Sequence, residues 1–273
     1  MTQELPPWHN ETMQWVILPE QRVLLCHVEK NAGTALMSLA HLAAGTPPWQ
    51  LRVSGSRGDE RFDDVVRWFW RSLSPAAQNV SVAALRDALR DGARRAADGW
   101  RTAVVLRDPV ERWVSAYKSK CEEADHDGMK HCHTFLGLPY HRGHPPTMVA
   151  VAAALGAMPA ERRCEWDPHW RPQSCFCSLK RTLPSFNERI PFHSFAQRMR
   201  SLYEGRVPSS TLDEIVRQAA NLTATPVHKL DRNHVTNAHA SELNDLTRTQ
   251  LQTLYHDDYA LLNESLINPF PRS

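Results

Sequence analysis

The sequence predicts an α/β fold, with a mainly parallel sheet flanked by helices, in one domain over residues 1–273. Two short apolar runs, 22–28 and 102–106, have the composition of strands buried on both faces, and each leads through a turn into a helix-forming segment. The third observation concerns residues 121–181, which are rich in Cys, His, Pro and aromatic residues and show little periodicity. We expect this segment to be an irregular insertion that carries function.

The first strand is expected at residues 22–28, with the sequence RVLLCHV. A short loop, residues 29–33, precedes a segment that begins at Thr34 and is rich in helix formers. Gly45, which two prolines soon follow, provides a stop for this helix. The first unit is therefore a strand, a loop and a helix.

The second unit begins with the strand TAVVL at 102–106 and continues through Arg107 into a helix. Asp108 suits the N-cap of this helix, Pro109 its first position and Glu111 its third. One face is apolar and comprises Val110, Trp113, Val114 and Tyr117. The opposite, polar face comprises Arg112, Ser115 and Ser119. We expect this polar face to point into a cleft.

Further helices are predicted on both sides of the insertion. Residues 61–98 alternate Arg and Asp in the manner of solvent-exposed helices, and we assign them no function. Helical patterns return near 209–220 and from Thr247, which forms a capping box with Gln250. No internal repeat is visible.

The overall charge excludes some partners. Lys and Arg number 32 against 30 Asp and Glu, a formal net charge of +2, so no global basic field points to nucleic acid. No apolar run approaches the ~20 residues that cross a bilayer, and the first ten residues lack the pattern of a signal peptide. We therefore expect membrane association only through an anchor that this sequence does not contain.

Both expected turns resemble sites that bind phosphate or sulfate through backbone amides and a helix N-terminus. Lys30 adds a mobile positive charge, and Gly33 lets the backbone approach an anion. Arg107 closes a strand at its carboxyl end, and Ser115 lies two turns along the next helix, so both reach one phosphate. The alternatives are an ordinary turn with a surface lysine, and an arginine that pairs with an acidic neighbour.

Four segments resemble motifs of the Golgi carbohydrate sulfotransferases. CHVEKNAGTAL, at 26–36, resembles their 5′-phosphosulfate loop, commonly H-x-x-K-x-G-G-T. The segment at 104–121 resembles their 3′-phosphate motif, R-D-P-x-x-R-x-x-S-x-Y. DPHWRPQSCFC, at 167–177, is similar to the H-W-x-P segment of the chondroitin, dermatan and HNK-1 type enzymes, and 254–262 is similar to their C-terminal Y-x-x-D-Y helix. The likeness spans most of the chain and is weak between motifs.

The resemblance implies a P-loop-like sulfotransferase fold and a set of donor-binding residues. Those that would cradle the phosphosulfate of 3′-phosphoadenosine 5′-phosphosulfate (PAPS) are Lys30, Asn31, Ala32, Gly33, Thr34 and Ala35. Arg107 and Ser115 would hold the 3′-phosphate. The sequence departs from the family at Ala32, where Gly is common, and at Glu29, where Pro or Gln is frequent. Alanine at 32 is tolerated at negative φ, whereas a positive φ there implies strain or a shifted loop.

The implied reaction is transfer of a sulfonate group from PAPS to a hydroxyl group, on a carbohydrate by family analogy, with acceptor binding by 121–181. Lys30 would neutralise charge on the leaving phosphate, and no metal is required. His169 is the candidate general base, because the matching position in related enzymes is a histidine and Trp170 beside it excludes water. His27 and Glu29 are the alternative bases.

Two other functions remain open at this point. A P-loop kinase-like phosphotransferase would share the strand–loop–helix start, but it needs G-x-x-x-x-G-K-S/T, which the sequence lacks. A non-catalytic binding protein that retains the fold is the second alternative, and the departure at Ala32 leaves room for it.

The cysteines and the N-x-S/T sequons bear on the compartment. The sequons lie at Asn10, Asn79, Asn221 and Asn263. With six cysteines, they favour the Golgi lumen, and the missing signal leaves the cytoplasm as the alternative.

Cys26 is expected to be an unpaired core residue, because it lies in an apolar strand. The remaining cysteines are an odd set, Cys121, Cys132, Cys164, Cys175 and Cys177. Disulfides that staple the insertion are expected in a lumen and free thiols in a cytosol. A zinc site formed by the last three with a histidine is the other alternative.

Overall fold

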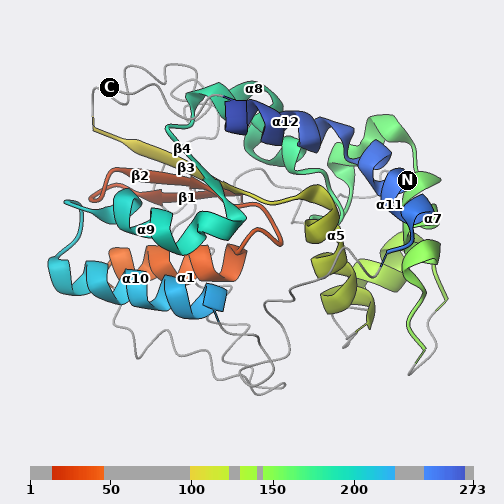
Figure 1. Ribbon diagram of the computed structural model, residues 1–273, viewed down its shortest axis with the longest axis horizontal. Coiled ribbons are helices and arrows are strands. Elements are labelled where there is room, and N and C mark those ends of the chain that lie inside the picture. The colour runs from red at the N-terminus through yellow and green to blue at the C-terminus, as the bar shows by residue number, and fades with distance from the viewer. Residues whose placement is uncertain (1–13, 46–98, 123–129, 140–143, 225–242, 268–273) are drawn as a thin grey trace, which may run out of the picture.

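The computed structural model has a four-stranded sheet at its centre (Figure 1). The structure describes residues 14–45, 99–122, 130–139, 144–224 and 243–267. The strands follow one another across the sheet in chain order and comprise β1 (Trp15–Leu18), β2 (Val23–Cys26), β3 (Arg101–Leu106) and β4 (Glu188–Pro191). β1 runs antiparallel to β2, whereas β2, β3 and β4 are parallel, which confirms the predicted mainly parallel α/β sheet.

The strand register brings the carboxyl ends of β2, β3 and β4 to one edge. Cys26 lies opposite Val104, and Leu106 lies opposite Pro191. The segments that follow these strands therefore meet at the same end of the sheet, where open α/β sheets bind their ligands.

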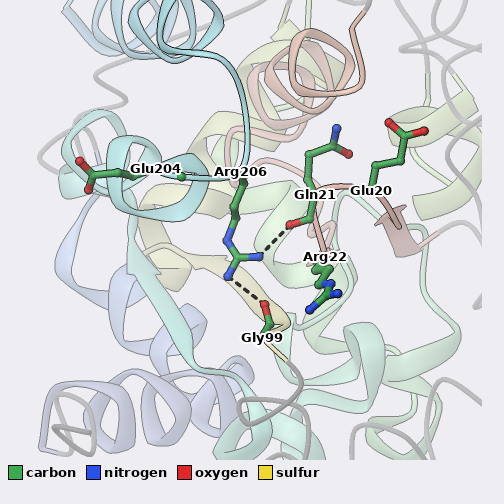
Figure 2. Close-up of a pocket in the computed structure, with 7 residues that line it drawn as sticks. Glu20, Gln21, Arg22, Gly99, Glu204 and Arg206 are labelled. Carbon is green, nitrogen blue, oxygen red and sulfur yellow. Dashed lines mark hydrogen bonds between the residues drawn. The ribbon is translucent and has the colours of Figure 1, made fainter.

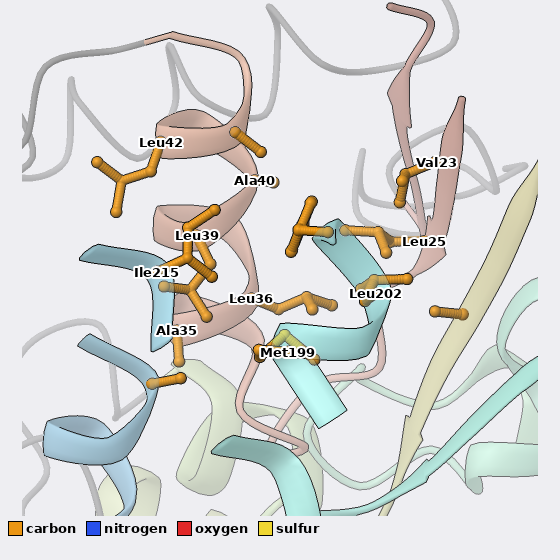
Figure 3. Packing of buried hydrophobic residues seen from close by; sticks show 14 of the residues in the cluster. Val23, Leu25, Ala35, Leu36, Leu39, Ala40, Leu42, Met199, Leu202 and Ile215 are labelled. Carbon is orange, nitrogen blue, oxygen red and sulfur yellow. The ribbon is translucent and has the colours of Figure 1, made fainter. Parts of the chain in front are cut away.

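Helices cover both faces of the sheet (Figure 1). One face carries α1 (Gly33–Ala43), α9 (Phe195–Tyr203) and α10 (Ser209–Ala224). Figure 3 shows leucines of α1 packed against Met199, Leu202 and Ile215 of these helices. The other face carries α8 (Leu179–Thr182) and α12 (His256–Ile267).

A second apolar core lies beside the sheet, around α5 (Pro109–Tyr117). The Asp108 carboxylate accepts hydrogen bonds from the backbone amides of Val110 and Glu111 at 2.9 and 3.0 Å, which confirms the predicted N-cap. The predicted apolar face of α5 packs against α7 (Met148–Gly156) and α11 (Asp245–Leu254). This packing fixes the direction in which α5 leaves the sheet.

The insertion consists largely of short helical turns. Besides α7, the described turns in and next to the insertion are η4 (Lys118–Glu122), η5 (Lys130–Thr134), η6 (Ala160–Glu165) and η7 (Gln173–Ser178). Two further turns, η8 (Leu183–Ser185) and η9 (Phe192–Ser194), flank β4. The segment is thus irregular in secondary structure and ordered in its packing.

All six cysteines form disulfides, which corrects the expectation for Cys26. Cys26 is buried in β2 as expected, but it pairs with Cys177 of η7. The other pairs are Cys121 with Cys132 and Cys164 with Cys175. This pairing leaves no thiol for the zinc alternative, and it is consistent with an oxidising, secretory compartment.

The helix expected from Thr247 begins earlier. α11 starts at Asp245, and the cap is Asn244, whose side chain accepts a hydrogen bond from the Thr247 amide at 2.8 Å. The helices predicted within 61–98 lie outside the described residues. Within the described part of the chain, no helix is both long and apolar enough to cross a membrane.

Candidate functional site

The loop after β2 is held in a conformation that L-residues rarely adopt. Lys30 and Ala32 have φ of 66° and 60°, and α1 begins directly afterwards at Gly33. The positive φ of Ala32 is the strained case foreseen for alanine at this position. A Cβ atom at Gly33 would lie 2.1 Å from His27 Nε2, so glycine is required here by the histidine packed against it.

The Asn31 side chain ties this loop to β3. Its Nδ2 donates to the backbone oxygen of Val105 at 2.8 Å and to Gln173 Oε1 at 2.5 Å. Gln173 in turn accepts from the Arg107 amide at 3.1 Å and donates to the Arg107 carbonyl at 2.8 Å. The Asn31 side chain is therefore buried and engaged, and only its backbone is left to face an anion.

Arg107 lies between the ends of all three parallel strands. Its Nη1 donates to the backbone oxygen of Lys30 at 3.2 Å, and its guanidinium carbon lies 4.3 Å from the ring centre of Phe192, just after β4. Its Nε lies 3.7 Å from the Glu111 carboxylate, so the expected alternative pairing is also present. Burial lowers the pKa of Arg107, and Glu111 partly counters this effect.

The Lys30 ammonium points toward the end of α5. Its Nζ donates to Ser119 Oγ at 2.5 Å, and Ser115, one turn earlier on the same side of the helix, is half-buried. Burial, reinforced by the charge of Lys120, lowers the pKa of Lys30 to about 7. The two predicted motifs thus meet in space through Lys30, Arg107 and the serine-bearing side of α5.

The two remaining residues that were predicted to bind the donor are Thr34 and Ala35. Ala35 is buried in the core between α1 and the sheet, so only its backbone is available to a ligand. The side chain of Thr34 lies outside what the structure describes.

Arg112 does not point into a cleft, contrary to the expectation for the polar face of α5. Its side chain is 1% exposed and donates to three backbone carbonyls, those of Glu29, Arg171 and Pro168, at 2.8, 2.8 and 2.9 Å. The helical periodicity predicted its face correctly, but the insertion covers that face. Arg112 therefore joins the loop after β2 to the segment that contains His169.

His169 belongs to a cluster of three polar side chains. Its Nδ1 lies 2.7 Å from Asp167 Oδ1, and His131 Nδ1 lies 2.5 Å from Asp167 Oδ2. Burial lowers the pKa of His169 to about 4, with a further contribution from Lys120. Burial alone would raise the pKa of Asp167, but the two histidines hold it well below its usual range.

The two alternative bases, His27 and Glu29, also have lowered pKa values. His27 is buried against Gly33, and burial lowers its pKa. Burial would raise the pKa of Glu29, but the positive charge of His27, His169 and the nearby lysines outweighs it and lowers this pKa to about 2. A carboxylate with so low a pKa is a weak proton acceptor at neutral pH.

The same cluster is where a metal ion would be sought among the described residues. The potential ligand atoms of His131, Asp167 and His169 all lie within 4.8 Å of one another. Ligand atoms around a tetrahedral zinc ion are about 3.3 Å apart, given metal–ligand distances of about 2.0 Å. The nitrogen–oxygen distances of 2.5 and 2.7 Å are instead those of charge-assisted hydrogen bonds.

Residues of α12 and the turn before it support this cluster, and sequence reasoning had not given them a role. Tyr255 donates its hydroxyl to the Trp170 carbonyl at 2.7 Å. The Asp258 carboxylate accepts from the amides of Gln173 and Ser174 at 2.7 and 2.8 Å. These are the first tyrosine and the aspartate of the Y-x-x-D-Y segment, so the motif itself was the available signal.

A surface hollow of about 350 Å³ lies at the opposite end of the sheet (Figure 2). Arg206 crosses it and donates to the carbonyls of Gln21 and Gly99 at 2.8 and 2.9 Å. Glu20 and Glu204 also line it, and its position at the amino ends of β2 and β3 separates it from the predicted site. We assign this hollow a structural role.

The chain is similar to known sulfotransferases. A carbohydrate sulfotransferase of Caenorhabditis elegans, chst-1, is 21% identical over an alignment of 242 residues, and the match covers 79% of this chain and 64% of that protein. The chain therefore spans just under two thirds of the length of this relative. No solved structure gives a significant match. The family model described as "Sulfotransferase family" matches residues 13–263, nearly the whole chain, and the protein therefore belongs to the sulfotransferase family.

Proposed function

We propose that this protein transfers a sulfonate group from PAPS to a hydroxyl group of a carbohydrate. The observation that carries the proposal is the meeting of Lys30 and Arg107 at the carboxyl ends of two adjacent parallel strands, directly before the N-terminus of α1. Family membership supports the reaction class, and the name of the nematode relative supports a carbohydrate acceptor.

The charges of this site fit a donor that carries several phosphate groups. Burial lowers the pKa of both Lys30 and Arg107, and neighbouring cations lower both further. A bound polyanion would relieve this repulsion. In the proposal, the Lys30 ammonium and the backbone from 30 to 35 hold the phosphosulfate, while Arg107 and Ser115 hold the 3′-phosphate.

Proton removal from the acceptor is assigned to His169. As the acceptor oxygen attacks sulfur and the bond from sulfur to the donor phosphate breaks, the hydroxyl proton passes to Nε2 of the imidazole. With its pKa lowered to about 4, His169 is neutral at pH 7 and ready to accept a proton. Asp167 stabilises the imidazolium that forms, and Lys30 stabilises the charge that develops on the leaving phosphate.

Two measurements test the assignment of the reaction. Calorimetric titration with 3′-phosphoadenosine 5′-phosphate measures donor-site binding, and radiolabelled PAPS offered with glycosaminoglycans, simple sugars and small alcohols measures transfer. We expect binding by the wild type and label on a carbohydrate. Binding without transfer to any acceptor would favour the non-catalytic alternative, and transfer of phosphate from ATP would favour a phosphotransferase.

His169→Ala separates chemistry from donor binding. We expect unchanged affinity for the desulfonated donor and turnover lower by about 10²-fold or more. Near-normal turnover would show that His169 is not the general base and would favour His27 or Glu29 in that role.

We further propose residence in the Golgi lumen, with acceptor binding by the insertion at 121–181. The three disulfides support the compartment, as do two sequons, Asn221 and Asn263, which are exposed on α10 and α12. Expression in a secretory host is expected to give a mass shift that an endoglycosidase removes. Reduced, unglycosylated protein in its native source would place it in the cytoplasm instead.

A further inference from the structure

The Asp167 carboxylate is shared by two histidines on different parts of the chain. Its Oδ1 accepts from the backbone amide of His169 at 2.9 Å and lies 2.7 Å from Nδ1 of the same residue. Its Oδ2 lies 2.5 Å from Nδ1 of His131 in η5. The two imidazole rings meet edge to face, with their centres 4.4 Å apart.

These contacts fix the hydrogen positions on both rings. An ionised carboxylate only accepts hydrogen bonds, and the two histidines hold the pKa of Asp167 well below its usual range. Both Nδ1 atoms must therefore carry hydrogen. A neutral His169 is then left with an unprotonated Nε2, which is the nitrogen that a general base needs.

We propose that His131 is a positioning residue for sulfonate transfer: by donating its Nδ1 hydrogen to Asp167, it holds the carboxylate in the orientation that keeps Nε2 of His169 unprotonated. The proposal rests on the proposed function, because it assigns His131 a role through the base of that reaction. Without His131, the buried Oδ2 loses its partner, and the carboxylate either turns or takes up a proton.

The structure holds His131 in place from several directions. Trp170, which is fully buried, donates its indole N–H to the His131 carbonyl at 2.6 Å. The next residue, Cys132, is disulfide-bonded to Cys121 at the end of η4. The His131 side chain is 13% exposed, so solvent reaches little of it. A side chain held in this way can in turn fix the position of Asp167.

Charged groups from other elements also act on His169. Lys120 of η4 lowers its pKa, whereas Asp167 and Glu29, from the loop after β2, raise it. Lys120 and Glu29 change the pKa of His169, but neither contacts its Nδ1 as Asp167 does. The hydrogen bond with Asp167 therefore selects which ring nitrogen carries the hydrogen.

The test uses two substitutions of His131 and one matched control in the full-length protein. His131→Leu removes the donor, whereas His131→Asn retains an amide N–H near the position of Nδ1. His133→Leu is the control, because His133 lies on the same turn, is more deeply buried than His131, and contacts the Pro139 carbonyl at 3.0 Å instead of Asp167. Each variant is measured for transfer kinetics and, by nitrogen NMR of labelled histidines, for the tautomer of His169.

For His131→Leu we expect kcat to fall about ten- to hundredfold, the effect of losing a hydrogen bond to a charged group. The KM for the donor should change by less than about twofold, because the effect lies in the chemical step. His169 should lose its single Nδ1–H tautomer in the same variant. His131→Asn should largely restore both kcat and the tautomer. His133→Leu should leave the His169 tautomer unchanged and lower kcat by less than His131→Leu does.

Several outcomes would overturn the proposal. One is a wild type in which His169 carries its hydrogen on Nε2. Another is His131→Leu with the kcat of the wild type, or with a loss of kcat no larger than that of His133→Leu. A third is His131→Asn that recovers neither kcat nor the tautomer. Stoichiometric binding of added Zn²⁺ by the three side chains would also overturn it, in favour of a metal site. An inactive wild type would refute the proposed function together with the role in transfer, whereas an active wild type with an unaffected His131→Leu refutes only the role of His131.

Discussion

Replacing Arg112 with methionine should strongly destabilise the protein, although methionine has a similar volume and no charged group to bury. The guanidinium donates to three carbonyls at 2.8, 2.8 and 2.9 Å, two of them in buried hydrogen bonds, and Arg112 is 1% exposed. Each such bond from a charged donor contributes about 1.5–3 kcal/mol. The sum overstates the loss, because the substitution also removes the cost of burying the charge, so we expect about 3–5 kcal/mol.

The assay is unfolding by urea and by heat, with the disulfides kept oxidised. A loss of about 3–5 kcal/mol corresponds to a Tm lower by roughly 6–20 °C, at about 2–4 °C per kcal/mol for a chain of this size. Arg112→Lys keeps the charge but cannot reach all three carbonyls, and should fall between Arg112→Met and the wild type. Arg162→Met is the matched control, because the Arg162–Glu165 pair is exposed, and its loss should cost less than about 1 kcal/mol.

Donor affinity should fall in the same variant. One of the three carbonyls belongs to Glu29, immediately before Lys30, so loss of Arg112 frees the loop that positions the ammonium. If Arg112→Met loses less than about 1 kcal/mol of unfolding free energy, the three hydrogen bonds are not the stabilising contacts described here.

The donor site gives three further predictions. Arg107→Ala should lower affinity for the desulfonated donor tens to hundreds of fold in calorimetry, about 2–3 kcal/mol, whereas Lys30→Ala should act mainly on kcat; equal, wild-type behaviour of both contradicts the donor site. Ala32→Gly should raise the unfolding free energy by up to about 1 kcal/mol in urea titrations, because φ is 60° there; a loss of stability would argue against that conformation. Because the pKa of Lys30 is lowered to about 7, a growing fraction of Lys30 is uncharged above that pH, so kcat/KM for the donor should fall as pH rises, and Lys30→Ala should abolish this dependence; a wild type whose kcat/KM does not change with pH would refute it.

Local sequence signals predicted the elements that position the site. The strands β2 and β3, the helices after them and the Asp108 cap depend on residues close together in the chain. β1 and β4 were not predicted, because β1 leads into an antiparallel strand and not into a helix, and β4 consists of two charged residues followed by Ile190 and Pro191. The partner of Cys26 was missed because it lies 151 residues away.

The site itself was predicted only in part, because the sequence does not show which distant segment packs against a given helix face. The helical period placed Arg112 on the correct face of α5 but could not show that residues 166–171 cover it. His169 was selected by its motif, whereas Asp167 and His131 become visible only when η5 folds against that motif.

The disulfide between Cys26 and Cys177 imposes an order on oxidative folding. Its cysteines are separated by 151 residues, whereas the other two pairs are each separated by 11. In the chain-entropy model, a disulfide stabilises the folded state by lowering the entropy of the unfolded chain. The stabilisation is about 5 kcal/mol for the long loop and about 3 kcal/mol for each short loop. During synthesis Cys121 and Cys132 emerge before Cys177, so each can form a non-native disulfide with Cys26 before the native partner of Cys26 is available. Correct pairing of this strand therefore depends on thiol–disulfide exchange, and the yield of native protein should follow the supply of a disulfide isomerase.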